Sequence, residues 1–213
     1  MNRAKTIYAT IYLICLMAFT GCASKLLVKP LENNCAQISL ELKLGKILEN
    51  TLDTAMSRLN EIEGTRTQNE IFDLPSIKKS IENAGYKNVE ISSPERTRLI
   101  LSFAGKFDFI ESDTDKTTLI VTPEAMQKFS NSLGEEFKSI MDLFMAPVLS
   151  DENMSNEEYA ELVAVVYGQP LAEEMLKSKM EFSIASPKGK TKAYKIPLVD
   201  LLTLSEEKIF TSE

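Results

Sequence analysis

Hydrophobic and polar residues alternate along several parts of the chain. Ile38, Leu40, Leu42 and Leu44 are separated by single polar residues, a period of two that is typical of a strand with one buried face. The same pattern predicts strands over 86–92, 99–109, 116–121, 180–184 and 194–196. We expect turns at 93–95 and 187–190, so the last two strands should form a β-hairpin.

Between these strands the apolar residues recur every three or four positions, which is typical of amphipathic helices. Helices are predicted at 47–63, 73–84, 123–146, 156–167 and 170–176. Ser155 and Glu158 have the spacing of a capping box. The pattern predicts one α+β domain over 35–213, with an antiparallel sheet of about six strands, about four helices packed against it and a helical layer at 123–178.

The helical layer carries the candidate ligand-binding residues. Six of the nine methionines lie between Met126 and Met180, and methionine adapts its shape to line apolar grooves. We therefore expect an apolar or acyl ligand between this layer and the sheet. The core face of an amphipathic helix gives the same pattern, so that alternative stays open. The proposed ligand-binding residues are Met126, Phe129, Phe137, Met141, Phe144, Tyr159 and Met175.

The N-terminus has the pattern of an export signal. Arg3 and Lys5 precede an almost uniformly apolar run from Ile7 to Phe19, which is the order of regions in a secretory signal peptide. The run is shorter than the about 20 residues that a transmembrane helix needs. Removal of residues 1–21 would begin the mature chain at Cys22.

Phe19, Thr20, Gly21 and Cys22 resemble the lipobox of bacterial lipoproteins. This resemblance implies that the Cys22 thiol carries a diacylglyceryl group, and two acyl chains give stable membrane anchoring. By the same resemblance, Ala23 after the cysteine favours the outer membrane of the cell envelope. Pro30 and the Asn33–Asn34 pair predict a lipidated tether over 22–34. The resemblance covers residues 1–24 and says nothing about the fold.

Composition excludes several classes of function. The chain has 24 basic and 31 acidic residues, a net charge of −7, which becomes −9 when Arg3 and Lys5 leave with the signal. Such a surface disfavours nucleic-acid binding. The chain has no histidine, which removes the commonest general base and transition-metal ligand.

Cys15 leaves with the signal and Cys22 is acylated, so Cys35 has no partner for an internal disulfide and is expected to be a small buried side chain.

Two further segments bear on the function. Asp108, Glu111, Asp113 and Asp115 offer oxygen ligands, but they lack the spacing of a calcium-binding loop, so we expect a solvated turn and no metal. The run 196–202 resembles the end of the LppM-like lipoprotein domain, an α+β envelope module associated with lipid binding.

We therefore expect a membrane-anchored, non-enzymatic lipoprotein without a cofactor, which binds an apolar ligand. The alternatives are a scaffold lipoprotein whose helical layer docks an envelope protein and, third, a hydrolase that uses only carboxylates.

Overall fold

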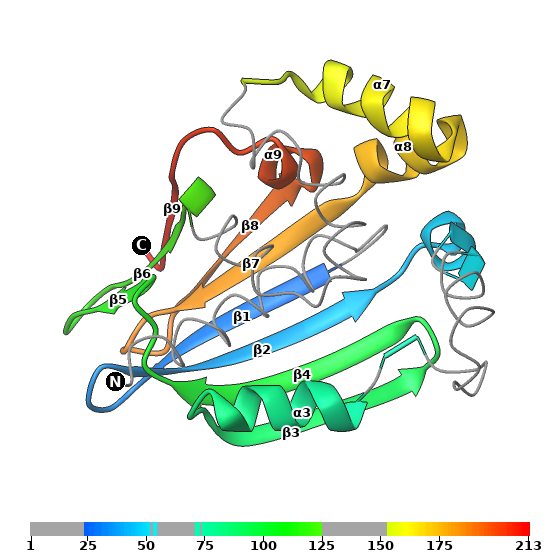
Figure 1. Cartoon of the computed structure of the whole chain (residues 1–213). Coiled ribbons are helices and arrows are strands. Elements are labelled where there is room, and N and C mark those ends of the chain that lie inside the picture. Colours follow the sequence, from blue (N-terminus) through cyan, green and yellow to red (C-terminus); the bar gives the residue numbers. More distant parts are fainter. Residues whose placement is uncertain (1–23, 52, 55–70, 73, 125–152) are drawn as a thin grey trace.

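The computed structural model describes residues 24–51, 53–54, 71–72, 74–124 and 153–213. Six strands form the main sheet, in the order β3-β4-β2-β1-β7-β8 (Figure 1). Their bounds are β1 Ser24–Leu31, β2 Cys35–Lys43, β3 Lys87–Glu95, β4 Arg98–Gly105, β7 Lys179–Ala185 and β8 Thr191–Pro197. The α+β class and a sheet of six strands are confirmed.

We had predicted an antiparallel sheet, and this is wrong, because the main sheet is mixed. β1 pairs with β7 in parallel, whereas all other neighbours in this sheet are antiparallel. The parallel pair arises because the chain reaches β7 through α8, a helix that returns it to the end of the sheet where β1 begins. Parallel strands need such a crossover, while antiparallel strands can be joined by a short turn.

The tether predicted over 22–34 is wrong for its described part. Ser24–Leu31 forms a central strand of the sheet, with Leu26 and Val28 buried. Asn33 and Asn34, which we had assigned to the tether, both have positive φ, and the Cys35 amide donates to the Glu32 carbonyl at 3.3 Å. Two central residues with positive φ are typical of a tight β-hairpin turn, and asparagine tolerates this conformation well.

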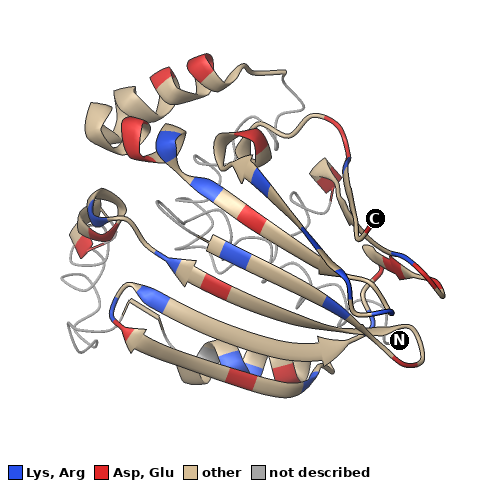
Figure 2. Cartoon of the chain, turned by 180° about the vertical axis from the view of Figure 1, so that it is seen from behind, with Lys and Arg blue, Asp and Glu red and all other residues tan. Residues whose placement is uncertain are grey.

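The two faces of the sheet differ sharply in chemistry. On the inner face, Leu26 lies beside Leu40, and Leu40 beside Leu101, all nearly fully buried. On the outer face the next row is Leu27, Ser39 and Ser102. Figure 2 looks onto the outer face, which none of the labelled helices covers.

The helical residues among those described do not reduce to the about four helices predicted: besides the helices named below, 53–54 and 123–124 are helical. α3 (Leu74–Asn83) packs against β3, and its buried side chains are Ile77 and Ile81. α7 (Asn156–Tyr167) and α8 (Gln169–Lys177) pack against each other. Another helical segment covers 46–51, and α9 is Val199–Leu202.

The predicted capping box is confirmed. The Glu158 amide donates to Ser155 Oγ, and Glu158 Oε2 accepts from the Ser155 amide at 2.8 Å. Gly168 ends α7 with φ of 93°, a conformation that glycine adopts without the steric cost of a Cβ atom.

A second sheet, absent from our prediction, has the order β5-β6-β9. It consists of β5 (Ile110–Ser112), β6 (Thr117–Val121) and β9 (Lys208–Thr211). Phe210 of β9 stacks on Phe182 of β7 with ring centroids 4.8 Å apart, and this pair joins the two sheets. α9 follows β8 and buries Val199, Leu201 and Leu202.

Two predicted strand limits are also wrong. β3 continues to Glu95, through the turn that we had placed at 93–95, and β4 ends at Gly105 and not at Phe109. The Tyr86 ring lies on Gly105, where an added Cβ atom would collide with it. Phe107 leaves the strand and stacks on the same ring, with centroids 5.0 Å apart.

Candidate functional site

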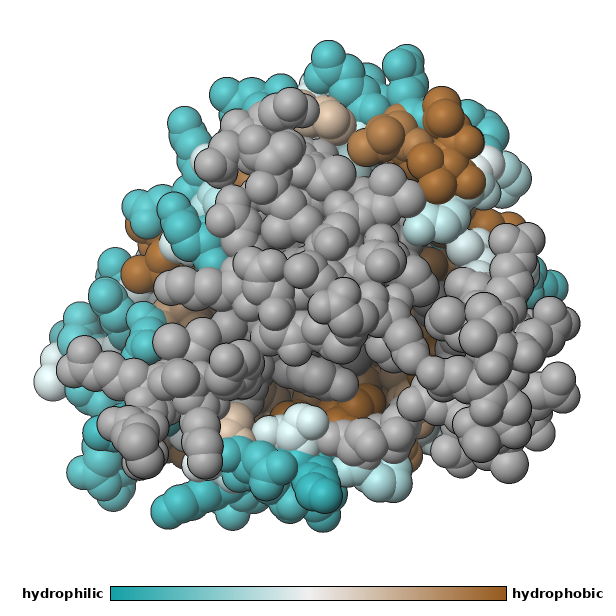
Figure 3. Space-filling model, in the orientation of Figure 1, coloured by the Kyte–Doolittle hydropathy of each residue, from teal (hydrophilic) through white to brown (hydrophobic). Residues whose placement is uncertain are grey.

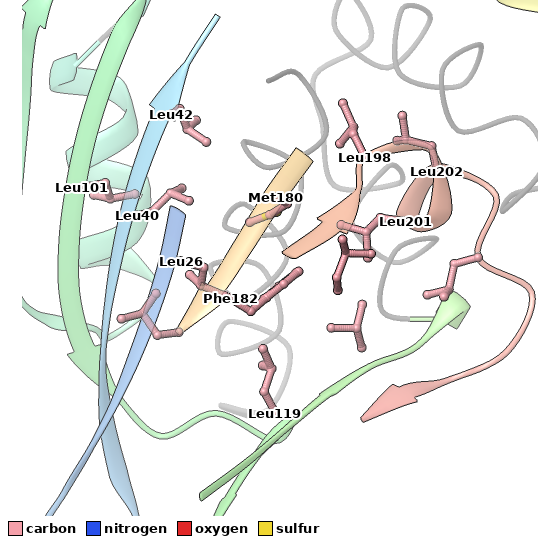
Figure 4. Packing of buried hydrophobic residues seen from close by; sticks show 14 of the residues in the cluster. Leu26, Leu40, Leu42, Leu101, Leu119, Met180, Phe182, Leu198, Leu201 and Leu202 are labelled. Carbon is pink, nitrogen blue, oxygen red and sulfur yellow. The ribbon is translucent and has the colours of Figure 1, made fainter. Parts of the chain in front are cut away.

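The inner face of the main sheet provides an apolar floor, which we define as Leu26, Leu40, Leu42, Leu101, Met180 and Phe182. These side chains project from β1, β2, β4 and β7 to the same side (Figure 4), and each is at most 1% exposed. Described elements also pack on this side, and Phe210 of the second sheet stacks on the floor residue Phe182. α3 lies along β3, α9 contacts β8, and the second sheet contacts β7.

One polar atom lies at the end of this floor. Ser24 begins β1 on the same face as Leu26, since residues two apart share a face. Ser24 is 1% exposed, and its hydroxyl has no hydrogen-bond partner among the described residues. A buried hydroxyl without a partner costs about 1–3 kcal/mol, so an acceptor supplied by a ligand would recover that free energy.

Helices α7 and α8 contribute the described part of the predicted ligand-binding set. Tyr159 and Met175 are both buried in the core cluster that contains the floor. Burial raises the pKa of Tyr159, with a smaller contribution from Tyr167. Met126, Phe129, Phe137, Met141 and Phe144 lie outside the described residues.

A long-range carboxylate fixes the end of the sheet where Ser24 lies. Glu174 of α8 accepts hydrogen bonds from the amides of Ile47 and Leu48, at 3.1 and 3.0 Å. These amides belong to the first turn of the helical segment 46–51, whose amides have no partner within the helix. The single side chain therefore joins α8 to the segment that follows β2.

The outer corner of the α7–α8 pair is apolar. Val165 is 85% exposed and Val166 48%. Figure 3 shows hydrophobic surface at this corner, next to hydrophilic surface on the neighbouring helical turns. Val163, two residues before Val165, is 2% exposed and packs inward.

The acidic turn behaves as a structural element. Asp113 Oδ1 accepts from the amides of Asp115 and Lys116, both at 2.8 Å, and these bonds lower the pKa of the Asp113 carboxyl. Asp115 pairs with Lys188. No group of three metal-ligating side chains occurs within the described part of the chain.

The residues predicted to form the signal peptide and the lipid anchor lie outside the described ranges. Cys22 precedes the first described residue, and residues 1–21 also lie outside the described ranges. No helix within the described ranges is long and apolar enough to span a bilayer. Cys35 is a half-buried free thiol at the β1–β2 turn and not the fully buried side chain that we had expected.

The chain matches no protein-family model, no curated protein and no solved structure. The likenesses to bacterial lipoproteins and to the LppM-like domain therefore stay predictions from the sequence. The run 196–202 has a structural role in this fold, because Asp200 accepts from Asn156 Nδ2 at 2.9 Å and fixes the start of α7.

We had not predicted β1, although its residues carry the alternating pattern of a strand. Leu26 and Val28 alternate with Lys25 and Lys29, which is a strand pattern, but Leu27 and Pro30 weaken it. Pro30 fits because the β1–β7 pairing ends at Val28, so only β2 pairs with this position.

Proposed function

We propose that the protein is a lipid-anchored, non-enzymatic envelope protein that holds an apolar ligand, such as an acyl chain, against the floor of its main sheet. The observation that carries the proposal is the juxtaposition of that floor with the buried Ser24 hydroxyl. A fatty acid needs an apolar surface for its chain and a hydrogen-bond donor for its carboxylate. Ser24 and the floor offer both on one face of one sheet.

The packing of helices α7 and α8 supports the same proposal. Tyr159 and Met175 belong to one cluster with Leu40 and Phe182, so these two helices and the sheet share an apolar interior. The floor is closely packed, and a ligand would therefore take the place of protein side chains packed against it.

The direct test is recovery of a ligand from the purified full chain. Organic extraction followed by mass spectrometry should recover a fatty acid or phospholipid at a fixed ratio to protein, and a fluorescent fatty acid should bind and be displaced by oleate. Protein that yields no extractable lipid and does not bind the probe would contradict ligand binding.

Ser24→Ala separates a binding role from a structural one. Removal of a buried hydroxyl without a partner should leave the free energy of unfolding unchanged or raise it by about 1 kcal/mol. Binding of the fluorescent fatty acid should weaken about tenfold, the equivalent of 1.4 kcal/mol, because the carboxylate loses its donor. Unchanged affinity would remove Ser24 from the site.

The matched control is Ser39→Ala. Ser39 also lies on a central strand, but on the outer face, where its hydroxyl is 3.2 Å from Ser102 Oγ. This substitution should leave fatty-acid binding unchanged. A similar loss in both variants would indicate a general effect on the sheet and contradict the assignment of Ser24.

The exposed valines of α7 favour a second candidate, in which the helical layer docks an envelope protein. An apolar side chain such as Val165, 85% exposed, gains free energy when a partner covers it. A photo-crosslinker at position 165 should then capture one protein in stoichiometric yield in native membranes. Absence of any crosslinked species would contradict this candidate.

A further inference from the structure

The end of the main sheet where β1 begins carries three lysines at its outermost positions. Lys43 ends β2, Lys179 begins β7, and Lys46 lies just beyond β2, at the start of the helical segment 46–51. β2 and β7 are the two neighbours of β1. Since adjacent strands lie about 4.8 Å apart, Lys43 and Lys179 flank the start of β1 at a mutual distance of about 10 Å.

These three lysines are available for a partner. All three are exposed, and none forms an ion pair within the described ranges. Figure 2 shows basic residues at the ends of neighbouring strands, with acidic residues one step further into the sheet.

The carboxylates around this end are already engaged. Glu41 binds Arg98 at 2.7 Å, and Glu181 lies 3.7 Å from Lys195. Three further carboxylates have partners: Glu49 pairs with Arg96, Glu173 with Lys177, and Glu174 accepts from the amides of residues 47 and 48. This end of the sheet thus presents three exposed lysines that have no ion-pair partner among the described residues.

The position of the anchor gives this charge a partner. Cys22 is two residues from Ser24, so the chain between them spans at most about 7 Å. Because Ser24 is already held in the sheet, a lipid on Cys22 would keep this end of the domain within about that distance of the bilayer surface. A lysine near an anionic membrane contributes about 1 kcal/mol of attraction.

We propose that Lys43, Lys46 and Lys179 contact anionic lipid headgroups and hold the domain with the start of β1 against the bilayer. The inference rests on the proposed anchoring through Cys22. The covalent lipid supplies the attachment, and the lysines supply the orientation. Only Ala23 lies between Cys22 and the first residue of β1.

The test measures the reactivity of each lysine in the full lipidated chain. The protein is reconstituted in vesicles of phosphatidylcholine with phosphatidylglycerol, and the vesicles are recovered by flotation. A water-soluble acetylating reagent is applied to this sample and to the protein in non-ionic detergent, and peptide mass spectrometry quantifies each site.

We expect acetylation of Lys43, Lys46 and Lys179 to fall at least fivefold in anionic vesicles, the equivalent of about 1 kcal/mol per lysine. Lys190, in the turn at the opposite end of β7, and Lys29, near the opposite end of β1, should react equally in both samples. Vesicles of phosphatidylcholine alone should protect the three lysines less.

A charge-reversal variant checks the cause. Lys43→Glu with Lys179→Glu should restore the reactivity of Lys46, whereas Lys29→Glu with Lys190→Glu should leave Lys46 protected. A chain that floats with all lysines equally reactive would overturn the orientation alone. A chain that does not float would overturn the anchor, and this inference with it.

Discussion

The two faces of the main sheet are made by the same strands, yet they have opposite roles. Leu26 and Leu27 are neighbours in β1, but Leu26 is 1% exposed and Leu27 38%. Beside Leu26 lies Leu40, and beside Leu27 lies Ser39. Because successive residues of a strand point to opposite faces, a single step along the chain separates the apolar floor from a surface of hydroxyls and charges.

The outer face is stabilised by polar pairs instead of burial. Gln37 Nε2 donates to Ser102 Oγ at 3.1 Å, and Arg98 Nε donates to Glu41 Oε1 at 2.8 Å. Exposed pairs of this kind contribute little, typically 0–1 kcal/mol. The buried inner face therefore provides most of the stability of the fold, so the outer face and its ends can carry charge. Pairs of like residues on the two sides test this division.

The largest difference is expected between Leu26→Ala and Leu27→Ala. Leu26→Ala leaves a cavity in the floor and should lower the free energy of unfolding by about 2–5 kcal/mol. Leu27→Ala removes a side chain that water already reaches, and should cost less than about 1 kcal/mol. Urea denaturation measures both. Equal losses would contradict the assignment of the two faces.

Val163 and Val165 extend the same comparison to α7. Val163→Ala removes two buried methyl groups at about 0.8 kcal/mol each, and we expect a loss of about 2 kcal/mol. Val165→Ala alters an exposed position and should change stability by less than about 0.5 kcal/mol. A thermal unfolding series would show the inner variant alone with a lowered Tm. A larger loss for Val165→Ala would place α7 in the opposite orientation.

Substitutions of the neighbouring residues Glu174 and Glu173 give a third comparison, this time between two carboxylates. Glu174→Ala leaves the amides of Ile47 and Leu48 without their acceptor and should cost about 1–2 kcal/mol, as loss of a helix cap does. Glu173 makes only an exposed pair with Lys177, so Glu173→Ala should cost at most about 0.5 kcal/mol. Hydrogen exchange at residues 47 and 48 should accelerate only in the Glu174 variant. Unchanged exchange there would rule out the long-range cap.

The smallest effect is a pH dependence at the start of α7. The Ser155 amide, and secondarily the Ser155 hydroxyl, lower the pKa of Glu158 below its usual value of 4.5. A carboxyl with a lowered folded pKa stabilises the protein above its unfolded pKa, and this stabilisation is lost as the pH falls through the folded value.

The wild type should therefore be slightly more stable than Glu158→Gln at neutral pH, and the difference should shrink as the pH falls below 4.5 and vanish below the folded pKa of Glu158. Denaturation curves of both proteins across this range measure it. A difference that persists at low pH would show that the carboxylate charge is not the cause.

The sequence predicted those elements whose signals are local. The strict alternation from Ile38 to Leu44 and the Ser155–Glu158 spacing are visible in a few consecutive residues, and both predicted elements are confirmed. The apolar spacing of α3 and α8 and the Pro187–Lys190 turn belong to the same class.

Features that depend on distant residues could not be predicted. The strand β1 is stabilised by pairing with β7, more than 150 residues later, and nothing in residues 24–34 encodes that partner. β9 has four residues and pairs with β6, where Thr118 and Thr211 are 93 residues apart in the chain. The Glu174 cap is likewise invisible in the sequence, because its acceptor and donors are 127 and 126 residues apart. For the candidate site, Tyr159 and Met175, which we had predicted to bind a ligand, are buried in the core. Ser24 was not predicted, since we had placed it in a tether.

The most direct test of the account concerns the few residues that precede the sheet. Complete tryptic digestion of the protein from native membranes releases the peptide that ends at Lys25, the first basic residue after Cys22. The account predicts a four-residue peptide, 22–25, whose mass includes a diacylglyceryl group on the Cys22 sulfur. An unmodified Cys22 thiol, or a peptide that still contains residues of the 1–21 leader, would contradict the anchor and the membrane-facing orientation of the sheet.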